Sequence, residues 1–197
     1  MKTVLIVLGV IVLILVIGFA SLFGVYNRFV TAEQGVNEKW AQVQNVYQRR
    51  SDLVPNLVET VKGFAAQERT VLEEVTRARA SATAIQLTPE ALADPKAIDR
   101  FQAAQNQLSG ALSRLLVTIE RYPDLKSNAN FLALQSQLEG TENRIAVERR
   151  RFNEAVRDYN TRLRLFPGSL VAGLAGYPPK AFFEAAPDAA AAPKVKF

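Results

Sequence analysis

Cysteine and histidine are both missing from this 197-residue chain, which has one methionine and one tryptophan. Without cysteine there can be no disulfide, iron–sulfur cluster or thiol nucleophile, and the chain is compatible with either side of a membrane. Without histidine it lacks the commonest general base and the commonest transition-metal ligand. A Ser–His–Asp triad, a zincin site and a di-iron site built on Glu-x-x-His are therefore excluded.

Other catalytic chemistries have no support in the spacing of the residues. A Ser–Lys pair or two carboxylates could act without histidine, but no such pair stands out from the pattern. We therefore predict that the protein is not an enzyme, with no catalytic residue, no cofactor and no bound metal.

The charge is modestly basic, with 24 lysines and arginines against 19 acidic residues. Arginines are scattered among glutamates along helical stretches, which is typical of a solvated, salt-bridged helix surface. A phospholipid headgroup surface is the alternative. We expect no nucleic acid partner, because no aromatic–basic interleaving and no finger or helix-turn-helix pattern accompanies the charge.

The longest apolar stretch is the first, from Val4 to Tyr26, and it holds no charge and no proline. At about 1.5 Å per residue, a helix of this length covers roughly 33 Å, enough for a bilayer core of roughly 30 Å. Lys2 and the small residues around Phe19 also resemble a cleavable signal peptide, but the apolar run continues past them. We predict an uncleaved transmembrane signal anchor over residues 1–26.

The flanks of this anchor carry nearly equal numbers of lysines and arginines: Lys2 precedes it, and Arg28 and Lys39 follow. The positive-inside rule therefore separates the two orientations only weakly. We predict the amino terminus in the cytoplasm and the domain on the extracytoplasmic side.

After the anchor, apolar residues recur at steps of three and four, the pattern of one buried stripe along a helix. The stripe begins at Val36 and Trp40 and keeps its phase as far as Val75. Pro55 lies in its middle and cannot donate to the carbonyl of Ser51, so a helix there must at least kink.

Two structures are compatible with Pro55. In one, Ser51 or Asp52 caps a new helix whose first turn tolerates the proline. In the other, a single bent helix runs from Asn27 to about Ile85. Such a helix would reach about 85 Å, far longer than the helix that follows, so we favour the break.

Two more long helices are predicted, from about Pro95 to Tyr122 and from about Asn128 to Phe166, with Asp94 capping the former. The second helix has an apolar row that repeats every seven residues, a pattern typical of left-handed, shallow-angle packing. The row consists of Phe131, Leu138, Ile145, Phe152, Tyr159 and Phe166.

These elements predict an all-α fold, in which the transmembrane helix continues into an antiparallel up-down four-helix bundle of long helices over residues 27–166. Three helices, the first kinked at Pro55, are the alternative. Residues 167–197 form a carboxy-terminal tail. We expect its Phe182–Phe183 pair to pack on the bundle and its last residues to be disordered.

Several polar residues fall on or beside the apolar stripes: Arg50, Glu68, Gln105, Glu142 and Arg149. A buried charge is costly unless paired, so these residues either form a polar layer across the bundle or lie at stripe edges with their charges in water. Our hypothesis for the layer of Glu68, Gln105, Glu142 and Arg149 is that Glu142 or Glu68 pairs with an arginine across the bundle.

A second group of polar residues lies at the expected helix break: Arg49, Arg50, Asp52 and Asn56. Charges gathered at a helix boundary favour a contact with a partner, and we predict that this is the interaction site. The simpler interpretation is that these residues serve the break itself.

Segments along most of the chain follow one familiar pattern: YNRFV (26–30), EQGV (33–36), WAQV (40–43), YQRRSDLVPNLVETVKGF (47–64), RFNEAVRDYN (151–160), FP (166–167) and FFE (182–184). Together they resemble the LemA family. The resemblance implies a bacterial membrane protein with one amino-terminal span and a bundle of long helices, and it favours four helices over three. Because YNRFV closes the apolar run, we expect the anchor and the first bundle helix to be continuous.

The resemblance implies no catalytic set, cofactor or ligand. Members of the family tend to accompany membrane quality-control or envelope proteins, and one branch belongs to magnetosome membranes, which suggests a scaffold role by analogy. We predict a non-enzymatic, single-pass scaffold or interaction protein of the bacterial inner (cytoplasmic) membrane. The alternative is an adaptor or regulatory subunit of a membrane protease or other envelope enzyme.

The expected partners are the lipid bilayer and another envelope protein. A homo-oligomer is a further alternative, in which exposed parts of the row from Phe131 to Phe166 pair between copies.

Overall fold

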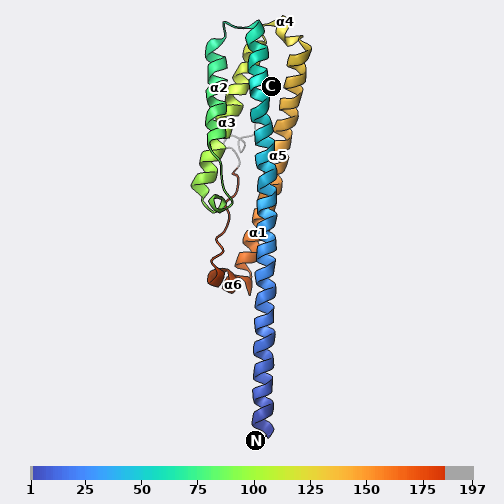
Figure 1. Cartoon of the computed structure of the whole chain (residues 1–197), viewed down its shortest axis with the longest axis vertical. Helices are drawn as coiled ribbons and strands as arrows, with labels where there is room; N and C mark the ends of the chain where they lie inside the picture. Colours follow the sequence, from blue (N-terminus) through green and yellow to red (C-terminus); the bar gives the residue numbers. More distant parts are fainter. Residues whose placement is uncertain (1, 185–197) are drawn as a thin grey trace, which may run out of the picture.

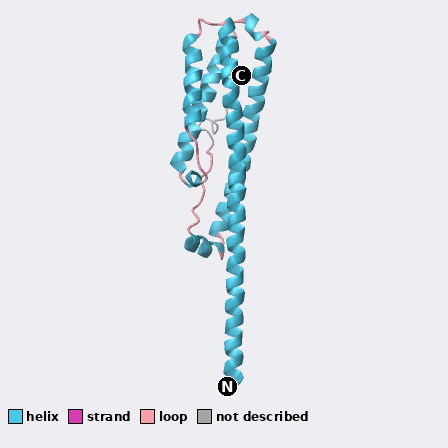
Figure 2. Ribbon diagram, viewed as in Figure 1, coloured by secondary structure: helices cyan, strands magenta, loops and turns pink. Residues whose placement is uncertain are grey.

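The computed structural model describes residues 2–184, and nearly all of this part of the chain is helical (Figure 1). The elements are α1 (Lys2–Phe64), α2 (Arg69–Ala84), the 3-10 helix η1 (Glu90–Ala93), α3 (Pro95–Ile119), the short α4 (Pro123–Lys126), α5 (Ala129–Arg164) and α6 (Gly168–Ala175). Figure 2 shows no strand in the described part of the chain, which confirms the predicted all-α class.

The long helices run alternately up and down one axis (Figure 1). α1 packs along α5 and against α2, and α2 packs on α3. α2 and α3 flank only the part of α1 that lies farthest from its N-terminus, whereas α5 follows α1 farther down (Figure 1). The lower part of α1 extends alone beyond the bundle.

α1 joins the apolar segment to the bundle without a break, over 63 residues and roughly 95 Å. The apolar segment has a mean hydropathy of 3.2 and is long and apolar enough to cross a membrane. Its large apolar side chains from Leu5 to Ile17 are exposed along the helix. The bundle therefore stands rigidly on the apolar segment, as the shared YNRFV pattern predicted.

The predicted helix break at Pro55 is wrong, because α1 continues through Pro55 to Phe64. Pro55 leaves the carbonyl of Ser51 without its usual intrahelical donor. Nε of Arg79, on α2, donates to that carbonyl oxygen at 2.8 Å instead. A neighbouring helix thus supplies the missing donor, and the carbonyl of Ser51 has a hydrogen-bond partner.

The single helix running to Ile85 is also wrong, because the chain reverses after Phe64 through a turn that ends at Glu68. The turn contains no proline, and no side chain caps the start of α2. Reversal places the apolar stripe of α2 inside the bundle. The buried residues of α2 are Leu72, Val75, Ala78 and Ala82.

The later helices begin near their predicted starts, at the predicted cap Asp94 for α3 and at Asn128 for α5. Asp94 accepts a hydrogen bond from the backbone N–H of Lys96 at the start of α3. Asn128 accepts from the N–H groups of Asn130 and Phe131 at the start of α5. Both helices end within about one turn of the predicted positions, and the link between them contains α4.

The interior consists of two apolar clusters along the bundle axis. The proximal core, nearer the apolar segment, is rich in aromatic rings and includes Phe29, Trp40, Tyr47, Phe101, Phe152, Tyr159 and Phe183. The distal core is almost wholly aliphatic and includes Val54, Leu57, Val61, Leu72, Val75, Leu108, Leu112, Leu115 and Leu138. The sevenfold row of α5 supplies both clusters and is buried within one chain apart from Phe166.

The residues after α6 return along the bundle as an extended tail that passes the α2–α3 connection (Figure 1). Phe183 is 4% exposed and stacks on Trp40 with a centroid distance of 6.0 Å, whereas Phe182 is partly exposed. The predicted packing of this pair is therefore correct for Phe183. The disorder predicted for the last residues, 185–197, concerns a segment outside the described residues.

Candidate functional site

Arg50 lies where the proximal and distal cores meet, and it is only 1% exposed. One guanidinium nitrogen, Nη1, donates to Oε1 of Glu142 at 2.8 Å and to Oγ of Ser109 at 2.7 Å. The other, Nη2, donates to the backbone oxygen of Gln105 at 3.2 Å and to its side-chain oxygen. One side chain of α1 thus joins α3 and α5.

Gln105 extends these bonds to α2, because its Nε2 donates to the backbone oxygen of Ala82 at 3.2 Å. The ring of Tyr47 lies beside the guanidinium of Arg50, 5.1 Å from centroid to Cζ. We call Arg50, Gln105, Ser109 and Glu142 the polar waist. A buried charge is tolerated here because it has both a counter-ion and several hydrogen-bond acceptors.

The predicted polar layer coincides with the waist in two of its four residues, Gln105 and Glu142. Glu142 pairs across the bundle with an arginine, Arg50, and is 44% exposed at the bundle surface. Arg149 lies elsewhere. Its Cζ is 4.7 Å from the ring centroid of Phe183, and its Nη2 donates to the backbone oxygen of Glu184 at 3.1 Å.

Glu68 also lies away from the waist, at the turn between α1 and α2. Its Oε1 accepts from the hydroxyl of Tyr122 at 2.6 Å and from Nη2 of Arg121 at 2.9 Å. The hydrogen bond to Glu68 raises the pKa of the Tyr122 phenol. Glu68 therefore fastens the distal turn to the end of α3.

The predicted interaction cluster separates into two environments. Arg49, Asp52 and Asn56 are exposed and share one outward face of α1. Arg50 points into the bundle, so its side chain is unavailable to a partner and its inclusion in the interaction site is wrong. Asp52 accepts a hydrogen bond from Nε2 of Gln48 at 2.7 Å, within the same helix.

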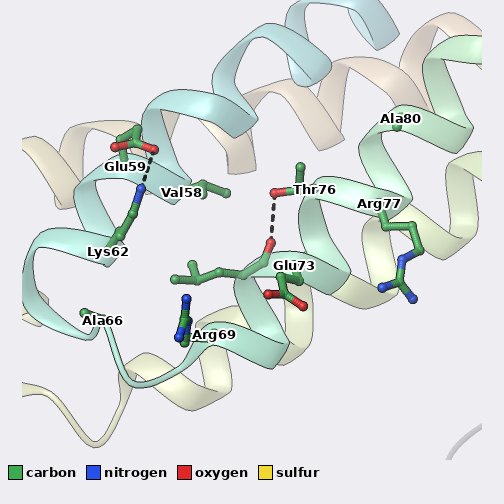
Figure 3. Close-up of a pocket in the computed structure, with 10 residues that line it drawn as sticks. Val58, Glu59, Lys62, Ala66, Arg69, Glu73, Thr76, Arg77 and Ala80 are labelled. Carbon is green, nitrogen blue, oxygen red and sulfur yellow. Dashed lines mark hydrogen bonds and ion pairs between the residues drawn. The ribbon is translucent and has the colours of Figure 1, made fainter.

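A surface hollow of about 880 Å³ lies between α1 and α2, near the turn that joins them (Figure 3). We call it the distal groove. Its charged lining comes from Glu59 and Lys62 on α1 and from Arg69, Glu73 and Arg77 on α2. Its uncharged lining consists of Val58, Ala66, Leu72, Thr76 and Ala80. Glu59 and Lys62 pair with each other at 3.5 Å, so the rim carries charges of both signs around an apolar floor.

The sequence model of the LemA family matches residues 39–197. That match covers most of the chain and the whole of the waist, the groove and the tail. The chain belongs to the LemA family. A search of curated proteins finds no match to the sequence.

Within this LemA chain, sequence reasoning missed the residues that hold the tail. Asn153 on α5 donates to the backbone oxygen of Phe183 and accepts from its N–H, each at 2.9 Å. Asn160, two helical turns farther on, makes the same pair of bonds with Lys180, at 2.8 and 2.9 Å. The seven-residue spacing of two asparagines beside the buried row of α5 is the signal that could have revealed them.

Lys180 was missed as well. Its ammonium group is nearly buried and lies 2.9 Å from the carboxylate of Glu33 on α1. It also donates to the backbone oxygen of Pro89 at 3.4 Å. Lys180 therefore ties the tail to α1 and to the α2–α3 connection at once.

Proposed function

We propose that this LemA protein is a non-enzymatic, single-pass scaffold of the bacterial inner membrane that binds another envelope protein outside the cytoplasm. The observation that carries the proposal is the single helix α1, which runs from the apolar segment through the bundle to Phe64. From Tyr26 to Phe64 it rises roughly 57 Å. It would hold the distal groove at a set height and orientation above the bilayer.

The interior of the bundle supports a structural role. Glu142 and Glu68, the carboxylates on the apolar stripes, both pair with arginines. These two groups are engaged in holding helices together.

The distal groove supports partner binding. It lies along two antiparallel helices, with Val58 and Leu72 on its floor and three basic and two acidic residues among its lining. An amphipathic helix from a partner would place its apolar stripe on the floor and its charges against the rim. The exposed Arg49, Asp52 and Asn56 continue on the outer side of α1 and would flank that contact.

A photocrosslinking experiment on the full-length protein in native membranes tests the proposal. A photoreactive amino acid at Ala80, in the groove, should capture one predominant protein, identified by mass spectrometry. The matched control is Ala146, an exposed alanine on α5 away from the groove, where the same protein should not be captured.

Equal capture from Ala80 and Ala146 would contradict a specific groove. Capture of a second copy of this chain from Ala80 would replace the proposed partner by self-association. Capture of a membrane protease would favour the adaptor role over a general scaffold.

A further inference from the structure

We propose that α6 and the turn before it form a second membrane contact, seated in the interface of the bilayer beside α1. This inference rests on the proposed membrane anchor and adds a lipid-binding surface to it. The surface consists of Leu165, Phe166, Leu170 and Leu174, which we call the apolar foot.

The side chains of the apolar foot are unusually exposed for their size. Phe166 is 84% exposed and Leu174 80%, and Leu165 and Leu170 are each at least half exposed. Leaving such a side chain in water forgoes the free energy that its burial would contribute. Apolar residues gathered in this way typically mark a contact surface.

α6 has no polar face that would explain this exposure as a solvated surface. Its sequence, GSLVAGLA, holds one polar side chain, Ser169. Val171 and Ala172 are buried against the proximal core, while Leu170 and Leu174 lie one helical turn apart on the other side. The protein covers one side of the helix and leaves an apolar side uncovered.

The position of α6 identifies the bilayer as the cover. Leu22 and Val25, in the last turns of the apolar run, pack against the same core cluster as Val171 and Ala172. α6 lies crosswise beside α1 at the lower end of the bundle, where α1 continues alone toward its N-terminus (Figure 1). If the apolar run spans the bilayer, α6 is at its boundary.

Two tyrosines reinforce this assignment. The ring of Tyr177, just after α6, lies 6.0 Å from the ring of Tyr26 and 5.6 Å from that of Phe29, centroid to centroid. Tyrosines are enriched at membrane–water interfaces because their rings are apolar and their hydroxyls are polar. The pair of Tyr26 and Tyr177 would mark the headgroup level.

Basic residues lie beside the foot on both long helices. Arg162 and Arg164 are in the last turn of α5, and Arg162 lines a shallow hollow of about 250 Å³ together with Arg28 of α1. Among the described residues, none of these three arginines has an ion-pair partner. Their charge is complementary to anionic phospholipid headgroups.

The absence of cysteine makes a direct test possible. Single cysteines are introduced into the full-length protein at Leu174, at Leu13 within the apolar segment, and at Val117, and each is labelled with an environment-sensitive fluorophore. Val117 is the matched control, because it is 72% exposed but lies on α3, away from the apolar segment. The labelled proteins are reconstituted in phosphatidylethanolamine–phosphatidylglycerol vesicles with brominated acyl chains, which quench nearby fluorophores.

Quenching at Leu174 should be within about twofold of that at Leu13 and about tenfold above that at Val117, since interfacial helices enter the headgroup–acyl boundary by about 5–10 Å. Bromine on phosphatidylglycerol alone should quench Leu174 more than bromine on phosphatidylethanolamine alone. A Leu170→Cys label should behave like Leu174. This second label shows whether the result at Leu174 is only a local effect of one substitution.

Each failure has its own signature. Quenching at Leu13 but not at Leu174 would overturn the second contact and leave the anchor intact. Absence of quenching at Leu13 would overturn the anchor and the second contact together. Self-quenching at Leu174 that disappears on dilution with unlabelled protein would show that a second copy covers the foot, which also contradicts the proposal.

Discussion

The proximal and distal cores of the bundle exclude water by different means. Around the distal core, α1, α2, α3 and α5 are all present, and aliphatic side chains fill the space between them. Around the proximal core, α1 and α5 are joined by the start of α3 and by α6, but much of the cover comes from the α2–α3 connection and the returning tail. Irregular backbone takes the place of α2 there, and large aromatic side chains fill the interior.

Where the extended tail takes the place of a helix, its backbone N–H and C=O groups need hydrogen-bond partners. A helix satisfies its own backbone, whereas an extended segment must find donors and acceptors elsewhere. The side chains of Asn153 and Asn160 supply them, and the N–H of Ala181 donates to the backbone oxygen of Leu92 at 2.8 Å. The tail is therefore an integral part of the fold.

The largest expected effect concerns the waist that separates the two cores. Glu142→Ala should lower the free energy of unfolding by about 2–3 kcal/mol, because it leaves the buried charge of Arg50 without its counter-ion. The loss stays below the roughly 3–5 kcal/mol of a fully buried pair because the Glu142 carboxylate is 44% exposed, so water can enter. Chemical denaturation of the protein in detergent measures the change.

The matched control for Glu142 is Glu74→Ala, which removes the exposed pair with Arg114. Exposed pairs contribute about 0–1 kcal/mol. If both variants lose the same free energy of unfolding, the polar waist stabilises the protein no more than an exposed ion pair does.

A middle-sized effect should distinguish the proximal core from the distal one. Asn153→Ala removes both bonds to the backbone of Phe183 and should lower stability by about 1–3 kcal/mol, since it leaves buried backbone groups unsatisfied. Hydrogen exchange should speed up at Lys180 and Phe183 and remain unchanged along α2.

Asn143→Ala serves as the control for Asn153, because Asn143 is exposed on the same helix. It should leave hydrogen exchange of the tail as in the native protein. Faster exchange along α2 in Asn153→Ala would mean that the two cores unfold as one unit, contrary to the prediction that only the tail is affected.

The smallest effect is a dependence on alkaline pH. Burial raises the pKa of the Tyr47 phenol, which lies in the proximal core. The unfolded chain ionises near pH 10, whereas the folded phenol keeps its proton to higher pH, so the associated stability is present below about pH 10 and is lost as the pH rises through the folded pKa. Tyr47→Phe should therefore flatten the decline of Tm above about pH 10, measured by circular dichroism.

Tyr122 at the distal turn provides the comparison for Tyr47. Its pKa is raised first by the hydrogen bond to Glu68, and burial is a smaller cause. Tyr122→Phe should change the alkaline decline of Tm less than Tyr47→Phe does. A larger change from Tyr122→Phe would place the main alkaline sensitivity at the distal turn.

Sequence patterns alone determined the all-α class, the apolar segment, the starts of α3 and α5, and the buried row of α5. These features depend on local rules: apolar length, helical periodicity, and the cap Asp94. The pairing of Glu142 with an arginine was one of two alternatives, because a charge on an apolar stripe needs either a partner or water, and the structure shows the pair.

Only the tertiary structure decided the path of the chain around Pro55, the direction of Arg50 and the anchoring of the tail. Pro55 stays within α1 because Arg79, on another helix, donates to the carbonyl that proline leaves open. The reversal after Phe64 has no proline or cap to signal it, and it occurs because α2 must bury its own stripe. Each outcome depends on a donor or a surface distant in the sequence, so local patterns could not reveal it.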